Sequence, residues 1–374
     1  MTGAVIVAAR RSPIGTAGHA LAGLTAAELA APVVRAVVDD TGLPAERVDE
    51  VVLGNCMGPG GDVARVAALQ AGLPVAVPAL TVDRQCASGL AAIGIAGALI
   101  GAGATAVVAG GVESASTAPW RFWPPTPDTA PRRYERAPFA PAGCDPDMGT
   151  AADDLARAAG IGRDRQDGYA ARSHAAAYAT REAGGFTDEI VAIGGVAADQ
   201  RPRAGMTCER LARLPPLHGG TLTAGNSCGV NDGAAVVAVV DAATQRRLGR
   251  PGLRIRAVAT AGVDPRLPGR GLVPAVHQAL CRAGLGLDDV DVIEFNEAFA
   301  GQVLACCAEL GLDERRVCVE GGALGLGHPW GASGAVLVVR LFTQLVRRGR
   351  GRIGLAAIAA GGGQGVAVVV EACR

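Results

Sequence analysis

Two residues of this chain have the chemistry of a nucleophile and its base. Cys86 follows the apolar run ALTVD and opens an Ala/Leu/Ile-rich stretch that is typical of a helix. A thiol at a helix N-terminus faces the positive end of the helix dipole, which favours the thiolate. His328 lies in GGALGLGHPWGASG (321–334), where Pro329 fixes the turn. A cysteine with a histidine base is an activated nucleophile, although each residue alone is also typical of a packed core side chain.

A third candidate lies in FNEAFAG (295–301), at the end of another apolar strand. The amide of Asn296 can hold a water molecule or orient a histidine, and Glu297 can brace the loop. Asn is also a preferred helix cap, so a purely structural role stays open for it.

The chain contains an internal repeat that places the first two candidates at equivalent positions. Three pairs of segments match in the same order: 41–56 with 283–298, 86–89 with 331–334, and 106–111 with 357–362. Matches in constant order indicate duplication. If the copies pair about a pseudo-twofold axis, the loops that carry Cys86 and His328 face each other.

An insertion interrupts the first copy. In the second copy, glycines lead directly into the strand GVAVVVE (365–371), whereas the equivalent GAAVVAVVD (233–241) lies far downstream of its own glycines. Alternating strands and helices place both halves in the α/β class and predict mainly parallel sheets with helices on both faces. We predict three units: an N-terminal half at 1–118 and 223–250, an inserted loop subdomain with one or two helices at 119–222, and a C-terminal half at 251–374.

Composition excludes several classes of function. The formal net charge is zero and no basic block stands out, so no nucleic-acid partner is expected. All 35 basic residues are arginine, which excludes both the Schiff-base lysine of pyridoxal phosphate enzymes and a P-loop lysine. The ten cysteines form no C-x-x-C pair and are typical of reduced cytosolic thiols, so we expect a cytoplasmic protein without a bound metal.

A membrane span and a nucleotide motif are both rejected. Residues 85–112 carry no charge and are long enough to span a bilayer, but seven glycines interrupt them. A buried helix followed by a buried strand is the better interpretation. The run LIGAGATA (99–106) matches a dinucleotide-binding pattern by letter, but it precedes a strand instead of following one.

Seven segments resemble the sequence blocks of the thiolase family of acetyl-CoA acyltransferases, in that family's order and over essentially the whole chain. They are IVAARRSPIG, QCASG, GGVES, TAGNSCGVNDGAA, NEAFAG, GHPWGASG and GGGQG. The resemblance implies the thiolase fold, in which two five-stranded α/β halves stack as five layers, α-β-α-β-α, and the inserted loop subdomain covers coenzyme A. It also implies a homodimer or homotetramer, because sheet edges near the nucleophile pair across subunits.

The resemblance assigns roles residue by residue. It implies that Cys86 is the acyl-accepting nucleophile and His328 its base, and that Asn296 holds a water that forms one oxyanion hole with His328. The backbone N–H groups of Cys86 and Gly361 would form the other. Acyl-CoA thioesters are then the substrates, and neither a cofactor nor a metal is implied. The positions that contact coenzyme A in the family are Met148, Arg203, Ala224, Cys228, Ala298 and Phe299.

The chain departs from the family at three positions. Thiolases usually read Cys-x-Gly-Gly-Gly in the last block, and that cysteine takes the α-proton of the second acyl-CoA, but this chain has Ala359 there. A methyl group cannot transfer a proton, and a general base typically contributes about 10²–10⁴-fold. Asp147 replaces a histidine before Met148, and Cys228 replaces a serine near the pantetheine arm. Both changes alter the substrate channel.

Three functions are compatible with these residues. The first is a thiolase-type acyltransferase of lipid metabolism, for Claisen condensation or thiolytic cleavage of 3-oxoacyl-CoA, in which Ala359 impairs proton transfer or is an introduced substitution. The second is a condensing enzyme that decarboxylates malonyl-type thioesters with a Cys-His-Asn set. The third is a catalytically silent acyl-CoA-binding protein, against which the retained Cys86, His328 and Asn296 argue. The density of thiolase blocks favours the first.

Overall fold

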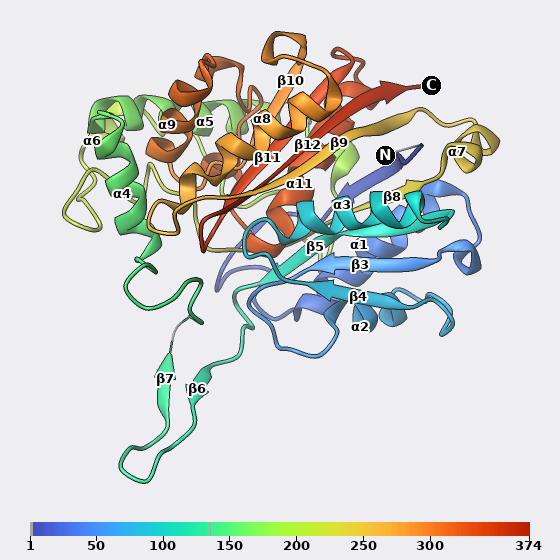
Figure 1. Ribbon diagram of the computed structural model, residues 1–374, viewed down its shortest axis with the longest axis horizontal. Coiled ribbons are helices and arrows are strands. Elements are labelled where there is room, and N and C mark those ends of the chain that lie inside the picture. Colours follow the sequence, from blue (N-terminus) through green and yellow to red (C-terminus); the bar gives the residue numbers. More distant parts are fainter. Residues whose placement is uncertain (1–2, 135) are drawn as a thin grey trace.

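The strands of the two halves of the chain join into one continuous β-sheet. The computed structural model describes residues 3–134 and 136–374, and the sheet runs through both halves (Figure 1). Its strands are β1 (Val5–Arg11), β2 (Gly15–Thr16), β3 (Glu50–Gly54), β4 (Ala79–Val82), β5 (Ala106–Ser114), β8 (Asn231–Val240), β9 (Gly252–Gly262), β10 (Val292–Phe295), β11 (Ile353–Ala360) and β12 (Gln364–Cys373). In space they follow the order β10-β11-β12-β9-β1-β8-β5-β3-β4, and β2 pairs with β8.

Helices cover both faces of this sheet. They are α1 (Ala26–Thr41), α2 (Val63–Gln70), α3 (Ser88–Gly101), α7 (Ala242–Leu248), α8 (Leu272–Ala283), α9 (Ala300–Leu310), α10 (Ala323–Leu326) and α11 (Trp330–Phe342). Short helical turns are η1 (Ala45–Arg47), η2 (Thr187–Glu189), η3 (Pro268–Gly271), η4 (Leu287–Asp289), η5 (Glu314–Arg316) and η6 (Thr343–Arg347). Within the described ranges, no helix combines the length and the apolar character needed to cross a bilayer.

Strand pairing confirms the duplication predicted from the sequence. In the first half, β3 pairs in parallel with β5, and β5 pairs antiparallel with β8. In the second half, β10 with β11 and β11 with β12 repeat this pattern. β4 adds a fifth strand to the first half, whereas its counterpart in the second half is a bridge between Ile293 and Val317.

The prediction of mainly parallel sheets is wrong. Of the strand pairs in the described parts of the chain, β3–β4, β3–β5 and β10–β11 are parallel and the rest are antiparallel. A tight turn at 361–363 joins β11 to β12, so β12 runs back beside β11 without a crossover helix. In the first half, β8 returns along β5 in the same way after the insertion.

Successive side chains of the strands pack in different hydrophobic cores, and this alternation confirms the five layers. Val107 of β5 packs in the same core as α3 and α11, whereas Val108 packs with α1 and α2. In the second half, Ile358 of β11 faces the core of α3 and α11, and Leu355 faces α8 and α9. Because successive side chains point to opposite faces of a strand, each half-sheet separates an outer helical layer from the shared central one. The order is therefore α-β-α-β-α (Figure 1).

The two central helices touch through glycines at their first turns. A Cβ on Gly89 would lie 2.8 Å from the carbonyl oxygen of Gly331, and a Cβ on Gly334 would lie 2.6 Å from the backbone N of Leu90. Only hydrogen fits there, so the starts of α3 and α11 are in backbone contact. The loops before these helices therefore face each other, as the repeat predicts. The uncharged stretch 85–112 is confirmed as a buried helix and strand, α3 and β5.

The insertion between β5 and β8 forms an arm and a lid. The arm is a hairpin of β6 (Arg121–Trp123) and β7 (Arg132–Tyr134), which projects from the body in Figure 1. The lid consists of α4 (Met148–Ala158), α5 (Arg163–Glu182) and α6 (Cys208–Ala212), one helix more than the sequence predicts. From α5, Tyr169 and Ser173 donate hydrogen bonds of 2.7 and 2.6 Å to the buried carboxylate of Glu297, which therefore braces its loop against the lid.

Substituting Gly111 of β5 tests the backbone contact beneath α11. A Cβ at this position would overlap the backbone of Gly331, so Gly111→Ala must push α11 away from the sheet. We expect the free energy of unfolding to fall by about 1–3 kcal/mol in a denaturant titration. Gly101→Ala in α3 is the matched control, because nothing lies within 4 Å of its added Cβ. Equal stability of both variants and the wild type would contradict this packing.

Candidate functional site

Cys86 is presented on a strained turn between β4 and α3. Gln85, the residue before it, has a φ of +48°, a left-handed conformation that residues other than glycine rarely adopt. The carboxylate of Asp83 accepts a hydrogen bond of 2.7 Å from the backbone N of Gln85. The hydroxyl of Ser88 donates to the carbonyl of Gln85 at 2.6 Å. Two side chains thus hold the turn in a conformation that the local sequence alone would not select.

The expectation that the helix dipole favours a thiolate at Cys86 is wrong for the free protein. The side chain is half-buried, and desolvation raises the pKa of its thiol to about 12, with the nearby Cys228 thiol adding to the rise. The backbone N–H groups of Cys86 and Gly361 lower this pKa, but by less. Removal from water outweighs the dipole, so Cys86 is a neutral thiol near neutral pH.

His328 is held as a neutral base beside Asn296. Its backbone N donates to Asn231 Oδ1 at 2.9 Å, and its Nδ1 lies 2.6 Å from Ser333 Oγ. Because the Ser333 hydroxyl donates to the carbonyl of Pro329 at 3.1 Å, its oxygen accepts from Nδ1–H. This tautomer leaves the lone pair on Nε2, which lies 3.4 Å from Asn296 Nδ2. Burial lowers the pKa of His328 to about 3, so the ring is uncharged.

Cys86 and Asn296 share one small cavity. It measures about 30 Å³, which is room for a water-sized group, and Ala359 lies in the same wall. Asn296 links this cavity to Nε2 of His328. The structure therefore brings together the thiol, the amide and the imidazole singled out in the sequence, with a methyl group where the family carries a second thiol.

The glycines after β11 let the insertion approach the site. A Cβ on Gly361 would lie 2.5 Å from the ring of Phe139, and a Cβ on Gly362, whose φ is +78°, would lie 2.5 Å from the carbonyl oxygen of Phe139. The backbone of this turn thus packs directly on the loop before α4. The backbone N–H of Gly361 lies close enough to the Cys86 sulfur to lower the pKa of the thiol.

A second, larger cavity also borders Cys86. It measures about 360 Å³, and its apolar wall includes Met57, Phe139, Met148 and Trp330. Met148 lines both this cavity and the small one. A thioester at Cys86 therefore has an apolar space beside it for the flexible part of a substrate.

Of the six positions expected to contact coenzyme A, three line the small cavity and a fourth, Cys228, is bonded to its wall. Met148, Ala298 and Phe299 line it. The backbone N of Cys228 donates to the carbonyl of Ala298 at 2.9 Å, which fixes the Cys228 loop against that wall.

The other two positions, Arg203 and Ala224, are exposed on the insertion. Neither lines a cavity that borders Cys86. Arg201 is instead held inward, where it donates to the carbonyls of Leu324 at 2.8 Å and Ser227 at 3.1 Å. An exposed guanidinium suits a phosphate group better than a thioester.

Asp147 has a structural role in the lid. Its carboxylate accepts from the backbone N atoms of Gly149 at 2.9 Å and Thr150 at 3.0 Å, which caps α4. His218 Nδ1 lies 3.6 Å from the same carboxylate. An imidazole is therefore present near this part of the channel, although it comes from another segment of the chain.

Sequence reasoning missed Ser333, Asn231 and the strained conformation of Gln85. Ser333 could have been found, because a residue in the first turn of a helix lies close to the loop that precedes it. Nothing in the sequence signals a positive φ at a glutamine. Across residues 3–134 and 136–374, no group of three or more His, Cys, Asp and Glu side chains is arranged to hold a metal ion.

Comparisons with known proteins agree with one another. The family model described as the thiolase N-terminal domain matches residues 4–243, and that of the thiolase C-terminal domain matches residues 248–372. An acetyl-CoA acetyltransferase of Pseudomonas aeruginosa is 44% identical and a probable acetyl-CoA acetyltransferase of Escherichia coli is 43% identical, each over 99% of both chains. The crystal structure of the Bacillus anthracis acetyl-CoA acetyltransferase, 40% identical, covers 100% of this chain and 99% of its own, with a TM-score of 0.94.

The pKa directions at the site predict how thiol reactivity depends on pH. A thiol whose pKa is raised to about 12 beside a histidine whose pKa is lowered to about 3 forms no thiolate–imidazolium pair at neutral pH. We therefore expect alkylation of Cys86 by iodoacetamide, followed by peptide mass spectrometry, to keep rising between about pH 8 and 10. A rate that is already level from about pH 7 would mean that the free protein holds a thiolate.

Proposed function

The chain belongs to the thiolase family of acyltransferases, and we propose that it transfers an acyl group from an acyl-CoA thioester to the thiol of Cys86. The observation that carries the proposal is the small cavity where Cys86, Asn296 and Ala359 meet beside the neutral His328. An uncharged thiol and an uncharged imidazole favour attack coupled to proton transfer.

The residues of the site account for each part of the acyl-transfer step. The Cys86 sulfur attacks the thioester carbonyl carbon while its proton passes to Nε2 of His328, and Ser333 keeps the proton on Nδ1. The carbonyl oxygen becomes an oxyanion that the backbone N–H groups of Cys86 and Gly361 stabilise. The carbon–sulfur bond to coenzyme A then breaks, and the departing sulfur takes the proton from His328. Cys86 is left acylated, and coenzyme A leaves as a thiol.

Ala359 separates this step from the second half of the family's reaction. Carbon–carbon bond formation or cleavage needs a group that exchanges the α-proton of the second acyl-CoA. The wall of the small cavity carries a methyl group at the usual position. We therefore propose that acyl transfer persists, whereas Claisen condensation and thiolysis of 3-oxoacyl-CoA are impaired.

The same substitution favours decarboxylative condensation as a second candidate. A malonyl-type thioester generates its carbanion by releasing CO₂, so it needs no proton-accepting cysteine. Cys86, His328 and Asn296 are the three groups that such a reaction uses. Nothing else in the chain favours this function over the first.

We also propose that the protein forms a dimer. β4, which leads into the Cys86 turn, is an edge strand of the sheet in the described part of the chain, and Leu80 on it is 42% exposed. An edge strand of this kind pairs readily with a second copy. The proposal also includes a homodimer or homotetramer, a cytoplasmic location, and no cofactor beyond the coenzyme A thioester that serves as substrate.

We expect this protein to acylate Cys86 but to catalyse thiolysis only slowly. After incubation with acetyl-CoA, peptide mass spectrometry should place the acetyl group on Cys86, and Cys86→Ser should abolish it. Thiolysis of acetoacetyl-CoA should be at least about 10²-fold slower than in Ala359→Cys, which returns a thiol to the cavity wall.

Two other results would change this assignment. Rapid thiolysis by the unsubstituted protein would show that another residue supplies the base, and Cys228→Ser would then test the thiol next to the site. If Ala359→Cys gains no thiolysis but malonyl-CoA is consumed with release of CO₂, decarboxylative condensation replaces the first function.

Arg203 is expected to act on binding and not on chemistry. Its exposed guanidinium lies outside the walls of both cavities at Cys86, where it suits a nucleotide phosphate. Arg203→Ala should raise KM for acetyl-CoA with a smaller effect on kcat. Arg213→Ala, which removes another exposed arginine of the insertion, is the control for loss of positive charge in general. An unchanged KM in Arg203→Ala would place the nucleotide elsewhere.

A further inference from the structure

A third cavity lies behind the candidate site. It measures about 20 Å³, and its polar wall residues are Glu294, Asn296, Ser333 and Arg340. Asn296 and Ser333 are the side chains that contact the two ring nitrogens of His328. We call this space the rear cavity. It shares only Asn296 with the small cavity of Cys86.

Two polar atoms on residues of the rear cavity have no hydrogen-bond partner among the described residues. They are Asn296 Oδ1, an acceptor, and Arg340 Nε, a donor. Their side chains belong to residues only 2% and 1% exposed. Buried polar atoms are almost always satisfied, so both require a partner. One water molecule can accept from Arg340 and donate to Asn296, and about 20 Å³ is room for one.

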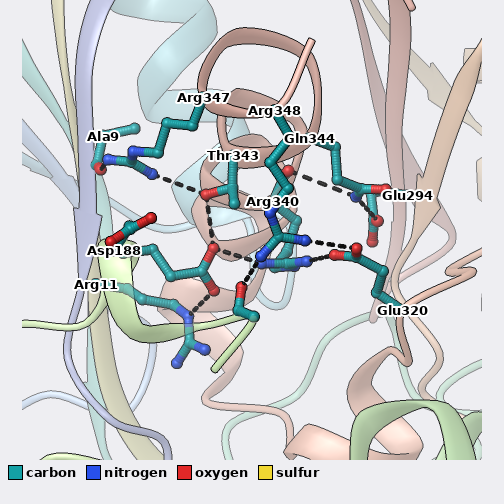
Figure 2. A network of polar contacts seen from close by, with 12 residues as sticks. Ala9, Arg11, Asp188, Glu294, Glu320, Arg340, Thr343, Gln344, Arg347 and Arg348 are labelled. Carbon is teal, nitrogen blue, oxygen red and sulfur yellow. Dashed lines mark hydrogen bonds and ion pairs between the residues drawn. The ribbon is translucent and has the colours of Figure 1, made fainter. Parts of the chain in front are cut away.

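Arg340 belongs to a buried charge cluster that fixes its guanidinium in place (Figure 2). The cluster consists of Arg11, Glu189, Asp199, Glu320 and Arg340. Arg11 donates to Glu189 at 2.7 Å and to Asp199 at 2.7 and 2.8 Å, and Arg340 donates to Glu189 and Glu320. Breaking a buried ion pair by removing one partner is strongly destabilising. The cluster therefore holds Arg340 at the wall of the rear cavity.

Glu294 is the carboxylate of the rear cavity itself. Its Oε1 accepts from Gln344 Nε2 at 2.6 Å, and Figure 2 shows the two side chains side by side. Burial raises the pKa of Glu294 to about 7; Arg340, Gln344 and Cys318 lower it, and Glu320 raises it further.

We propose that the rear cavity binds one water molecule, which accepts from Arg340 Nε and donates to Asn296 Oδ1, and that Arg340 thereby positions the Asn296–His328 pair. A donor on Oδ1 fixes the amide so that Nδ2 faces the imidazole, as the structure has it. Ser333, from the same wall, fixes the other ring nitrogen. The water site stands on the geometry alone, whereas its effect on acyl transfer rests on the proposed function.

A crystal structure of the wild-type protein tests the water site directly. Density for one water within hydrogen-bond distance of Asn296 Oδ1 and Arg340 Nε is the expected result. Val336→Ile adds a methyl group to the cavity wall and changes no polar group, so its crystal should lack this water. An empty rear cavity in the wild-type crystal would overturn the proposal.

Val336→Ile tests the positioning role, because it displaces the water and changes no polar group. It should slow acylation of Cys86 by acetyl-CoA about five- to tenfold, the effect of one lost hydrogen bond, with KM unchanged because no substrate contact is altered. Arg350→Gln is the matched control, because Arg350 pairs with Glu320 but does not line the rear cavity.

Alkylation of Cys86 by iodoacetamide gives a second readout that needs no acyl-CoA. Val336→Ile should slow this alkylation by a similar factor, because the imidazole that accepts the thiol proton loses its fixed position. Circular dichroism checks that the variant folds. A wild-type alkylation rate in the folded variant would overturn the positioning role. If Cys86 is never acylated but the water is present and Val336→Ile is alkylated more slowly, the proposed function fails and this inference stands.

Discussion

The starts of α3 and α11 lie in backbone contact, and the candidate site depends on that contact. Gly89 and Gly334 have no room for a side chain against the facing helix, and Gly111 has none against Gly331. Since glycine is the only residue that allows such an approach, the two loops before these helices are brought face to face. Cys86 comes from one loop and His328 from the other. The duplication thus supplies a site that neither half contains alone.

The same close packing takes the reactive groups out of water. Desolvation raises the pKa of Cys86 and lowers that of His328, so both are neutral before a substrate binds. In such a site, backbone N–H groups act as oxyanion donors at full strength because solvent does not compete with them. The polar groups in the walls of the small cavity, other than Cys86, are amides and backbone groups. Burial therefore favours a reaction in which a proton moves between neutral partners.

Buried charged side chains lie behind the site, and their ion pairs connect three segments of the chain. Arg11 comes from β1, Arg340 from α11, and Glu189 between them from the insertion. These side chains are at most 1% exposed, so their pairing fixes how the insertion meets both halves. Glu297 makes a second such connection, through Tyr169 and Ser173 of the lid. Both connections hold the insertion against the loops that carry the site.

Periodicity and the internal repeat were sufficient to predict two α/β halves and to single out Cys86, His328 and Asn296, whereas the five layers and the importance of Ala359 came from the resemblance to the thiolase family. Those features are local in sequence, since strands, helix starts and glycine turns are specified by neighbouring residues. The antiparallel return of β12 and the ionisation of Cys86 were decided only in the folded chain. The first depends on which strands meet after a tight turn, and the second on how much water the packed helices exclude. The rear cavity and the charge cluster at Arg340 are likewise tertiary, because their members are distant along the chain and only packing brings them together.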